Sequence, residues 1–228
     1  MSGTITINAE SINNTFKNFA KGLIINIECE DNIISKYSGE TDFQIQGEEF
    51  NNNCIEHIIN KLENSKIFNN NTITNCDSIT NEGSVINNKI NDINNSTIGL
   101  NGNVVNNKLY DLESVIINGE FSNNFIKESI NNCEFTSTFT NNISLGSISD
   151  CRINVFSKNR IYDSITDLNS SDTITDCVFN HTINQLICTK LINCQFDFID
   201  NLQLTNDVYY TTFHGNISNP DNLSQYEY

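Results

Sequence analysis

The residue types that most often carry out chemistry are few and scattered in this chain. Its three histidines are His57, His181 and His214, and no two of them have the spacing of metal ligands on one element. The sequence has no CxxC motif, nucleophile elbow, phosphate-binding loop or Ser/His/Asp signature. We therefore expect no metal site, no cofactor and no catalytic residue, and we expect that the protein is not an enzyme.

The best case for chemistry is a group of polar residues late in the chain. Polysaccharide-active proteins need carboxylates or basic residues that project together from one outer face. The candidate binding loop contains Asp163, Asp167, Asn169 and Asp172, with residues 167–172 expected to loop outward. Asp150, Arg152, Arg160 and Asp176 lie close to it in sequence. The alternative, which we favour, is a solvated acidic rim, because acidic side chains are mostly exposed.

The charge balance excludes several partners. The chain of 228 residues has 12 Lys and Arg against 28 Asp and Glu, a formal net charge of -16. Such a field repels nucleic acids and anionic membranes, so we expect neither as a partner. No stretch approaches the roughly 20 apolar residues of a membrane helix. Residues 1–14 lack the features of a signal peptide, so we expect synthesis in a host cytoplasm without secretion.

Paired asparagines followed by an apolar residue recur through the middle of the chain. Two copies are Asn87-Asn88-Lys89-Ile90 and Asn106-Asn107-Lys108-Leu109. The second positions are Asn71, Asn88, Asn107, Asn124, Asn142 and, in a degenerate copy, Asn159. They are separated by 17, 19, 17, 18 and 17 residues, which is the mark of an internal repeat.

A second motif lies between the copies of the first, and it is a small residue, any residue, then a large apolar one. Its first positions are Ser96, Ser114, Cys133, Cys151, Cys177 and Cys194, separated by 18, 19, 18, 26 and 17 residues. The long step is the reason for expecting a loop between Cys151 and Cys177. Two offset series with one period, together with 14 Phe and 7 Tyr, argue against a disordered Asn-rich chain.

A period near 18 residues fits one circuit of a parallel β-solenoid built from short strands. Asparagine tolerates the left-handed backbone of a sharp corner, and stacked amides can pass hydrogen bonds from coil to coil. We therefore expect the six asparagines to form a ladder, and Cys133, Cys151, Cys177 and Cys194 to stack as small buried groups. Neighbouring pairs could form disulfides, but we favour free thiols because a cytosol is reducing.

Three regions are expected along the chain. Residues 65–200 hold the repeat, with room for about seven coils. Residues 1–64 do not follow it and are expected to form an N-terminal α+β cap or docking region, with a helix over residues 53–63 and Asn53 as its N-cap. Residues 201–228 are a C-terminal cap or tail that is rich in aromatic residues. These are Tyr209, Tyr210, Phe213, Tyr226 and Tyr228.

The expected coils resemble right-handed parallel β-helices with asparagine ladders, over roughly residues 65–200. The steps Cys133-Glu134-Phe135 and Cys177-Val178-Phe179 also resemble pentapeptide-repeat coils, although the strict five-residue step is lost after one unit. The fold class that the resemblance implies is all-β, a right-handed parallel β-helix, or β-solenoid.

The resemblance and the composition leave three functions open, since this architecture hosts many. The first is a non-enzymatic structural or attachment protein of a virus or phage particle, such as a capsid decoration, fibre or tail component. Its partners would be other particle proteins and its own copies, as in a trimer, and its location would be the virion. The second is a glycan-binding or glycan-cleaving β-helix. The third and weakest is an acidic mimic of DNA.

Overall fold

The computed structural model describes most of the chain as short β-strands. The described residues are 5–7, 10–17, 23–25, 29–37, 43–45, 49–64, 67–81, 83–90, 93–94, 97–98, 102–170, 172–205, 208–215 and 220–221. All regular elements in these ranges are strands, and no helix occurs among them. It follows that no described helix could cross a membrane.

The strands follow one another with short connections along the whole chain. The first group is β1 (Ile5–Ile7), β2 (Ser11–Ile12), β3 (Thr15–Lys17), β4 (Leu23–Ile25), β5 (Cys29–Glu30), β6 (Ile33–Tyr37), β7 (Phe43–Ile45), β8 (Glu49–Asn51), β9 (Cys54–Asn64), β10 (Ile67–Asn69) and β11 (Thr72–Asn81). The second is β12 (Val85–Ile86), β13 (Lys89–Ile90), β14 (Ile93–Asn94), β15 (Thr97–Ile98), β16 (Val104–Val105), β17 (Lys108–Leu109), β18 (Leu112–Glu113), β19 (Ile116–Ile117), β20 (Phe121–Ser122), β21 (Phe125–Ile126) and β22 (Ile130–Asn131). The third is β23 (Glu134–Thr140), β24 (Ile143–Ser144), β25 (Ile148–Ser157), β26 (Arg160–Ile161), β27 (Ile165–Ser170), β28 (Thr173–Thr175), β29 (Val178–Cys188), β30 (Lys190–Ile192), β31 (Gln195–Leu204), β32 (Val208–Tyr209), β33 (Thr212–Phe213) and β34 (Pro220–Asp221).

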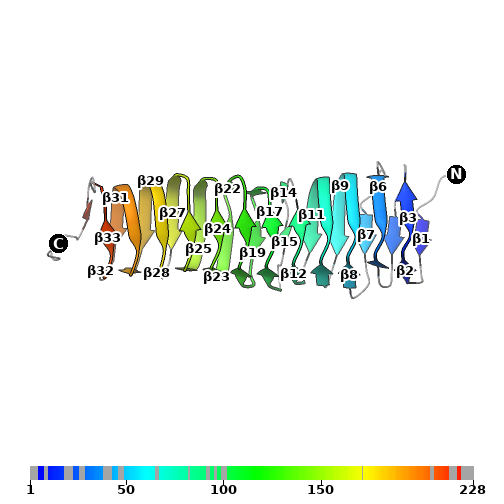
Figure 1. Ribbon diagram of the computed structural model, residues 1–228, viewed down its shortest axis with the longest axis horizontal. Helices are drawn as coiled ribbons and strands as arrows, with labels where there is room; N and C mark the ends of the chain where they lie inside the picture. The colour runs from blue at the N-terminus through cyan, green and yellow to red at the C-terminus, as the bar shows by residue number, and fades with distance from the viewer. Residues whose placement is uncertain are drawn as a thin grey trace.

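Each strand pairs in parallel with the strand that lies one coil further along the chain. Ile5 of β1 pairs with Leu23 of β4, and Ile130 of β22 pairs with Ile148 of β25. Figure 1 shows the result, a rod of stacked coils that runs from β1 and β3 at the blue end to β33 at the red end. The expectation of a parallel β-solenoid is confirmed.

The coils turn sharply at residues with a left-handed backbone, whose φ values lie between 50° and 58°. At the first bend these residues are Asn13, Asp31, Asn52, Asn70, Asn87, Asn106, Asn123, Asn141, Lys158, Asp176, Asn193 and Tyr210, and at a second bend they are Ser114, Asn132, Asp150 and Asp167. Asn and Asp occupy nearly all of them because their short polar side chains lower the cost of this conformation. The first asparagine of each Asn-Asn pair therefore turns the chain.

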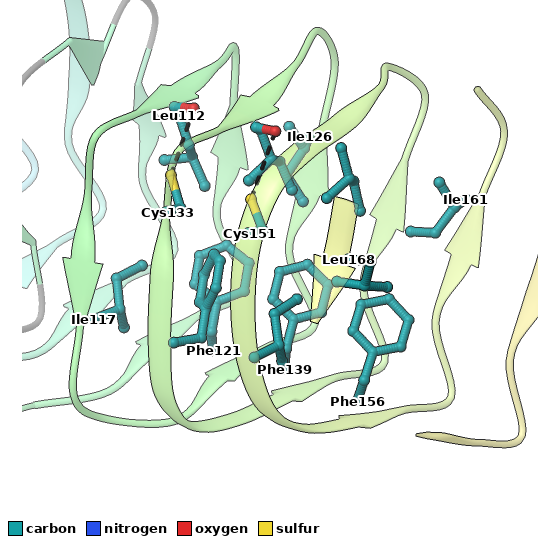
Figure 2. Packing of buried hydrophobic residues seen from close by; sticks show 14 of the residues in the cluster. Leu112, Ile117, Phe121, Ile126, Cys133, Phe139, Cys151, Phe156, Ile161 and Leu168 are labelled. Carbon is teal, nitrogen blue, oxygen red and sulfur yellow. Dashed lines mark hydrogen bonds between the residues drawn. The ribbon is translucent and has the colours of Figure 1, made fainter. Parts of the chain in front are cut away.

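Alternation along the strands sends one set of side chains into the interior of the coil. Phenylalanines pile up there, with ring centroids 5.0 Å apart between Phe121 and Phe139 and 5.2 Å apart between Phe139 and Phe156. Figure 2 shows these three rings one behind another. The pile continues through Phe179, Phe196 and Phe213. Stacked rings bury large areas and add attraction of their own, so the core runs along the rod axis.

The helix expected over residues 53–63 is wrong. These residues lie mostly in strand β9, which pairs with β6 on one side and with β11 on the other. Ile55 is paired with Ile34 and Ile73 on the neighbouring coils, so contacts between coils override the helical spacing of the local sequence. The α+β cap is thus not present in the described residues, and the parallel pairing runs on through β1 to β9.

The C-terminal part adds a last set of paired strands. β32 pairs with β30, and β33 pairs with β31, where Phe213 meets Phe196 at a ring-centroid distance of 5.3 Å. Tyr210 stands outward with 88% of its surface exposed. Tyr226 and Tyr228, the other aromatic residues of the expected tail, lie outside the described residues.

Candidate functional site

The second asparagine of each pair points into the coil and belongs to a buried ladder. At Asn88, the side-chain Oδ1 accepts hydrogen bonds from the backbone N–H of Asn71 at 2.8 Å and from its Nδ2 at 3.0 Å. The Nδ2 of Asn88 donates to the carbonyl of Phe68 at 2.8 Å and to Oδ1 of Asn107 at 3.1 Å. Every polar atom of this amide is therefore paired, which removes the cost of burying it.

The same pattern repeats from coil to coil. The expected residues Asn71, Asn88, Asn107, Asn124, Asn142 and Asn159 lie one above another in this ladder, each at most 2% exposed. Asn32 and Asn53, which the sequence analysis placed outside the repeat, belong to it as well. The signal was present, because Asp31-Asn32 and Asn52-Asn53 are pairs of the same kind.

Beyond Asn159 the ladder position passes to cysteine. Val178 pairs with Arg160, and Gln195 pairs with Val178, so Cys177 and Cys194 stand directly above Asn159. The thiol of Cys177 donates to the carbonyls of Thr175 at 3.1 Å and Phe156 at 3.7 Å. Each thiol reaches the carbonyl on the preceding coil that an asparagine amide would reach, so it replaces half of the amide.

Cys133 and Cys151 occupy the other bend of the coil. Their thiols donate to the carbonyls of Leu112 at 3.6 Å and Ile130 at 3.7 Å on the preceding coils (Figure 2). The four cysteines therefore form two separate stacks on neighbouring coils, and they are free thiols. Leu168 follows Cys151 at the second bend.

The long step between Cys151 and Cys177 is a change of bend and not an insertion. The expected outward loop at residues 167–172 is wrong, because β27 continues through Ser170 in register with β25. Asp172 and Thr173 then lead into β28, which pairs with β25 and β30. A thiol suits both bends equally, so the motif could not reveal the change.

Two other motif copies sit differently from the sequence expectation. Ser114 takes the left-handed position of the second bend, and Val115 is the buried residue that follows it. Ile143, after Asn142, is 39% exposed, while Ser144 takes the interior position and donates to the carbonyl of Gly146 at 3.0 Å. Ser96 lies outside the described residues.

The buried thiols are held in their neutral form. Burial raises the pKa of Cys29 from 9.0 to about 12, although a hydrogen bond with Asn32 opposes the shift. Burial also raises the pKa of Cys188 to about 12. The hydrogen bond with Cys133 and then burial raise the pKa of Cys151, and burial raises that of Cys177. These thiols are poor nucleophiles, because the thiolate is the reactive form.

An open groove of about 530 Å³ runs over the outer side of the second bend. Its walls include Ile116, Glu134, Arg152 and Asn169, which are paired in register on four successive coils. Ser114, Asn132, Asp150 and Asp167, the four left-handed residues of this bend, also line it. An adjoining groove of about 430 Å³ continues over Thr136 and Asn154. The two form one polar furrow along the rod.

The groove contains half of the predicted binding loop. Asp167 and Asn169 line it, whereas Asp163 and Asp172 do not. Asp163 accepts a hydrogen bond from the backbone N–H of Ser164 at 2.7 Å, and Asp172 accepts one from Thr173 Oγ1 at 3.2 Å. Glu134 and Arg152 come instead from the two preceding coils, and only the pairing register brings them in.

A second groove, of about 420 Å³, lies on the outer side of the first bend. Phe125 and Ile143 form part of its wall, and Lys158 and Arg160 bring two positive charges to it. Asn123 and Asn141 line it too. The sequence analysis did not predict this site, because its cations are single residues that only the stacking gathers.

The histidines stand apart from both grooves. His181 and His214 are exposed, and the side chain of His57 lies outside the described residues. Within the described ranges no three His, Cys, Asp or Glu side chains are grouped so that they could hold a metal ion.

Comparison with known proteins leaves the chain without a match. No protein-family model, no curated protein and no solved structure matches this sequence or its fold.

Proposed function

We propose that this chain is a non-enzymatic structural or attachment protein of a virus or phage particle, such as a capsid decoration, fibre or tail component. The observation that carries the proposal is the buried ladder from Asn32 to Asn159. Each ladder amide is bound to the coils on both sides of it, so bending or sliding one coil would break several buried hydrogen bonds at once. Such a rod suits a part that bears load or sets a spacing.

The finer features of the proposal rest on the resemblance to β-helices of tail spikes and fibres. These are the right-handed winding of the coils, the virion as location, and other particle proteins and its own copies as partners, with a trimer as the model assembly. The formal net charge of -16 supports protein partners over nucleic acid. Many exposed Asn and Asp side chains cover the bends, as expected of a surface that faces solvent on a particle.

The direct test is an inventory of particle proteins. Particles purified by density gradient from lysates of the organism that encodes the chain are analysed by quantitative mass spectrometry. Peptides of this chain should sediment with the particles in a fixed ratio to the major capsid protein, and should remain after a salt wash. Particles that contain the other structural proteins but lack this chain would overturn the proposal.

Glycan binding is the second candidate, and the groove at the second bend favours it. Carboxylates and amides from Glu134, Asp167 and Asn169 face a furrow that is open along the rod, as a linear polysaccharide requires. A glycan array with the native protein should give signals that Asp167→Asn removes. Asn keeps the left-handed backbone, so the fold should be unaffected.

The matched control is Asp172→Asn, which makes the same change outside the groove and should leave the signal intact. Release of reducing ends from a bound glycan would extend the candidate to cleavage. Silence over a broad array of neutral and acidic glycans would retire it.

A further inference from the structure

The outer side of the first bend gathers cations around exposed apolar side chains. Lys108, Phe125, Ile143 and Arg160 are paired in register on four successive coils and project outward. We define the basic face as Lys108, Phe125, Lys127, Ile143, Leu145, Lys158, Arg160 and Tyr162. Ile143, Leu145 and Tyr162 are 39%, 44% and 45% exposed, so apolar area remains uncovered in the middle of this face.

The charge of this face opposes that of the chain as a whole. Four of the 12 Lys and Arg residues lie on it, in a protein of net charge -16. The carboxylates beside it are already engaged. Glu128 forms an ion pair with Lys127 at 3.6 Å, Asp163 accepts from Ser164, and Asp176 accepts from Asn193 at 2.7 Å. A partner for this face should therefore be acidic and should offer apolar area.

The groove of the second bend has those properties. Ile116, 46% exposed, stands among the carboxylates of Glu134, Asp150 and Asp167, with Arg152 as the cation in the same groove. We call this the acidic groove. Its side chains project from exposed positions on strands and bends, so they can contact another molecule without any rearrangement of the coil.

We propose that the basic face of one copy docks side by side into the acidic groove of a second copy. This rests on the proposed function in that the rod works as an oligomer, and it names the two surfaces that meet. Their charges are complementary, and each has an exposed isoleucine, Ile143 or Ile116, at its centre. The net charge of the chain does not prevent the contact, since at about 0.1 M salt charges more than about 10 Å apart are screened.

The two surfaces also lie at the same height along the rod. One circuit of the chain runs from Phe125 past Glu134 to Ile143, so it visits the basic face, the acidic groove and the basic face again. Two parallel copies therefore meet without any shift along the axis. The contact is heterologous, because each copy uses two different surfaces, so it closes into a ring such as a trimer or extends into an array.

The test uses sedimentation velocity of the full chain over a range of concentrations at about 0.1 M salt. Arg160→Glu should turn the basic face against the acidic groove, and Glu134→Lys should turn the acidic groove against the basic face. Each should weaken self-association by about tenfold or more, because like charges then meet across the interface. The controls Lys190→Glu and Glu120→Lys change charge by the same amounts outside both surfaces and should associate like the native chain. Circular dichroism confirms that all variants fold.

Mixing the two interface variants gives the sharper result. Arg160→Glu copies present two acidic surfaces and Glu134→Lys copies present a basic face and a neutralised groove, so the mixture should associate where neither variant alone does. A native chain that stays monomeric, or variants that associate normally, would overturn the inference, as would a basic face that binds acidic glycans while the chain is monomeric. Association in solution is independent of the particle inventory, so failure of either proposal is visible without the other.

Discussion

Asn159 and Cys177 fill the same place on two successive coils. Asn159 accepts from the backbone N–H of Asn142 at 2.8 Å and donates to the carbonyl of Phe139 at 2.8 Å, as every ladder asparagine does toward its preceding coil. Cys177 also reaches the preceding coil, where it donates to Phe156, but it has no oxygen to offer to Asn159. The ladder of amide oxygens therefore ends at Asn159.

Cys177→Asn should extend the ladder by one coil and stabilise the protein. The new Oδ1 would accept from the backbone N–H and Nδ2 of Asn159, and the new Nδ2 would donate to Phe156, as at the other ladder positions. A buried hydrogen bond contributes about 1 kcal/mol net, so we expect a gain of about 1–2 kcal/mol in the free energy of unfolding. Urea unfolding followed by circular dichroism measures it, with Cys177→Ala as a control that should destabilise. A loss for Cys177→Asn would show that the thiol position is too narrow for an amide.

Removing an amide from the middle of the ladder should have a large effect of the opposite sign. Asn107→Ala leaves the backbone N–H and Nδ2 of Asn88 without their acceptor and the carbonyl of Val85 without its donor. Each buried group left unpaired costs about 1–3 kcal/mol, so we expect a loss of about 3–5 kcal/mol. Asn103→Ala, an exposed change at a nearby position, should cost less than about 1 kcal/mol. Equal losses for the two variants would contradict the role given to the ladder.

The buried thiols should make the protein sensitive to alkali. The pKa of Cys29 and that of Cys188 rise from 9.0 to about 12 on folding, so the neutral thiols favour the folded state. Their contribution is complete below pH 9 and is lost as the pH rises from 9 toward 12, since only unfolded chains release these protons easily. Each thiol should lower the free energy of unfolding by about 1.4 kcal/mol per pH unit in this window.

Urea unfolding at pH 8 and at pH 10.5 checks this expectation. Cys188→Ala removes one titrating group, so its loss of stability between the two pH values should be smaller than that of the native chain. Both proteins keep the same lysines and tyrosines, whose titration therefore cancels in the comparison. Identical losses would mean that Cys188 ionises alike in the folded and unfolded states.

Much of the ladder could be predicted from the sequence, because each Asn-Asn pair carries its own signal. The first asparagine tolerates the left-handed bend, the second faces inward, and both needs recur once per coil. The pairs at Asn32 and Asn53 were missed because they are 21 residues apart and because Ile55, Ile58 and Leu62 have helical spacing. Pairing with the coils on either side decides that conflict, and no local pattern contains it.

The candidate site was harder to predict, because its residues meet only through the register. Asp167 and Asn169 were identified from their own sequence neighbourhood, whereas Glu134 and Arg152 come from earlier coils that pair with it. The change of bend between Cys151 and Cys177 hid that register, since a thiol fits both bends. A single misplaced bend shifts every outward neighbour on the later coils.

Tyr210 should be replaceable with a gain in stability. It has a left-handed backbone, with φ of 50°, at a bend where most coils have Asn or Asp, and its side chain is 88% exposed. The left-handed conformation costs an ordinary residue about 1–2 kcal/mol, and asparagine less, while almost no buried contact is lost with the ring. Tyr210→Asn should therefore raise the free energy of unfolding by about 0.5–1 kcal/mol, measured by urea unfolding. Tyr210→Ala is the matched control and should bring no such gain, because alanine resists this backbone as tyrosine does. If both variants gained equally, the benefit would come from loss of the exposed ring and not from the bend.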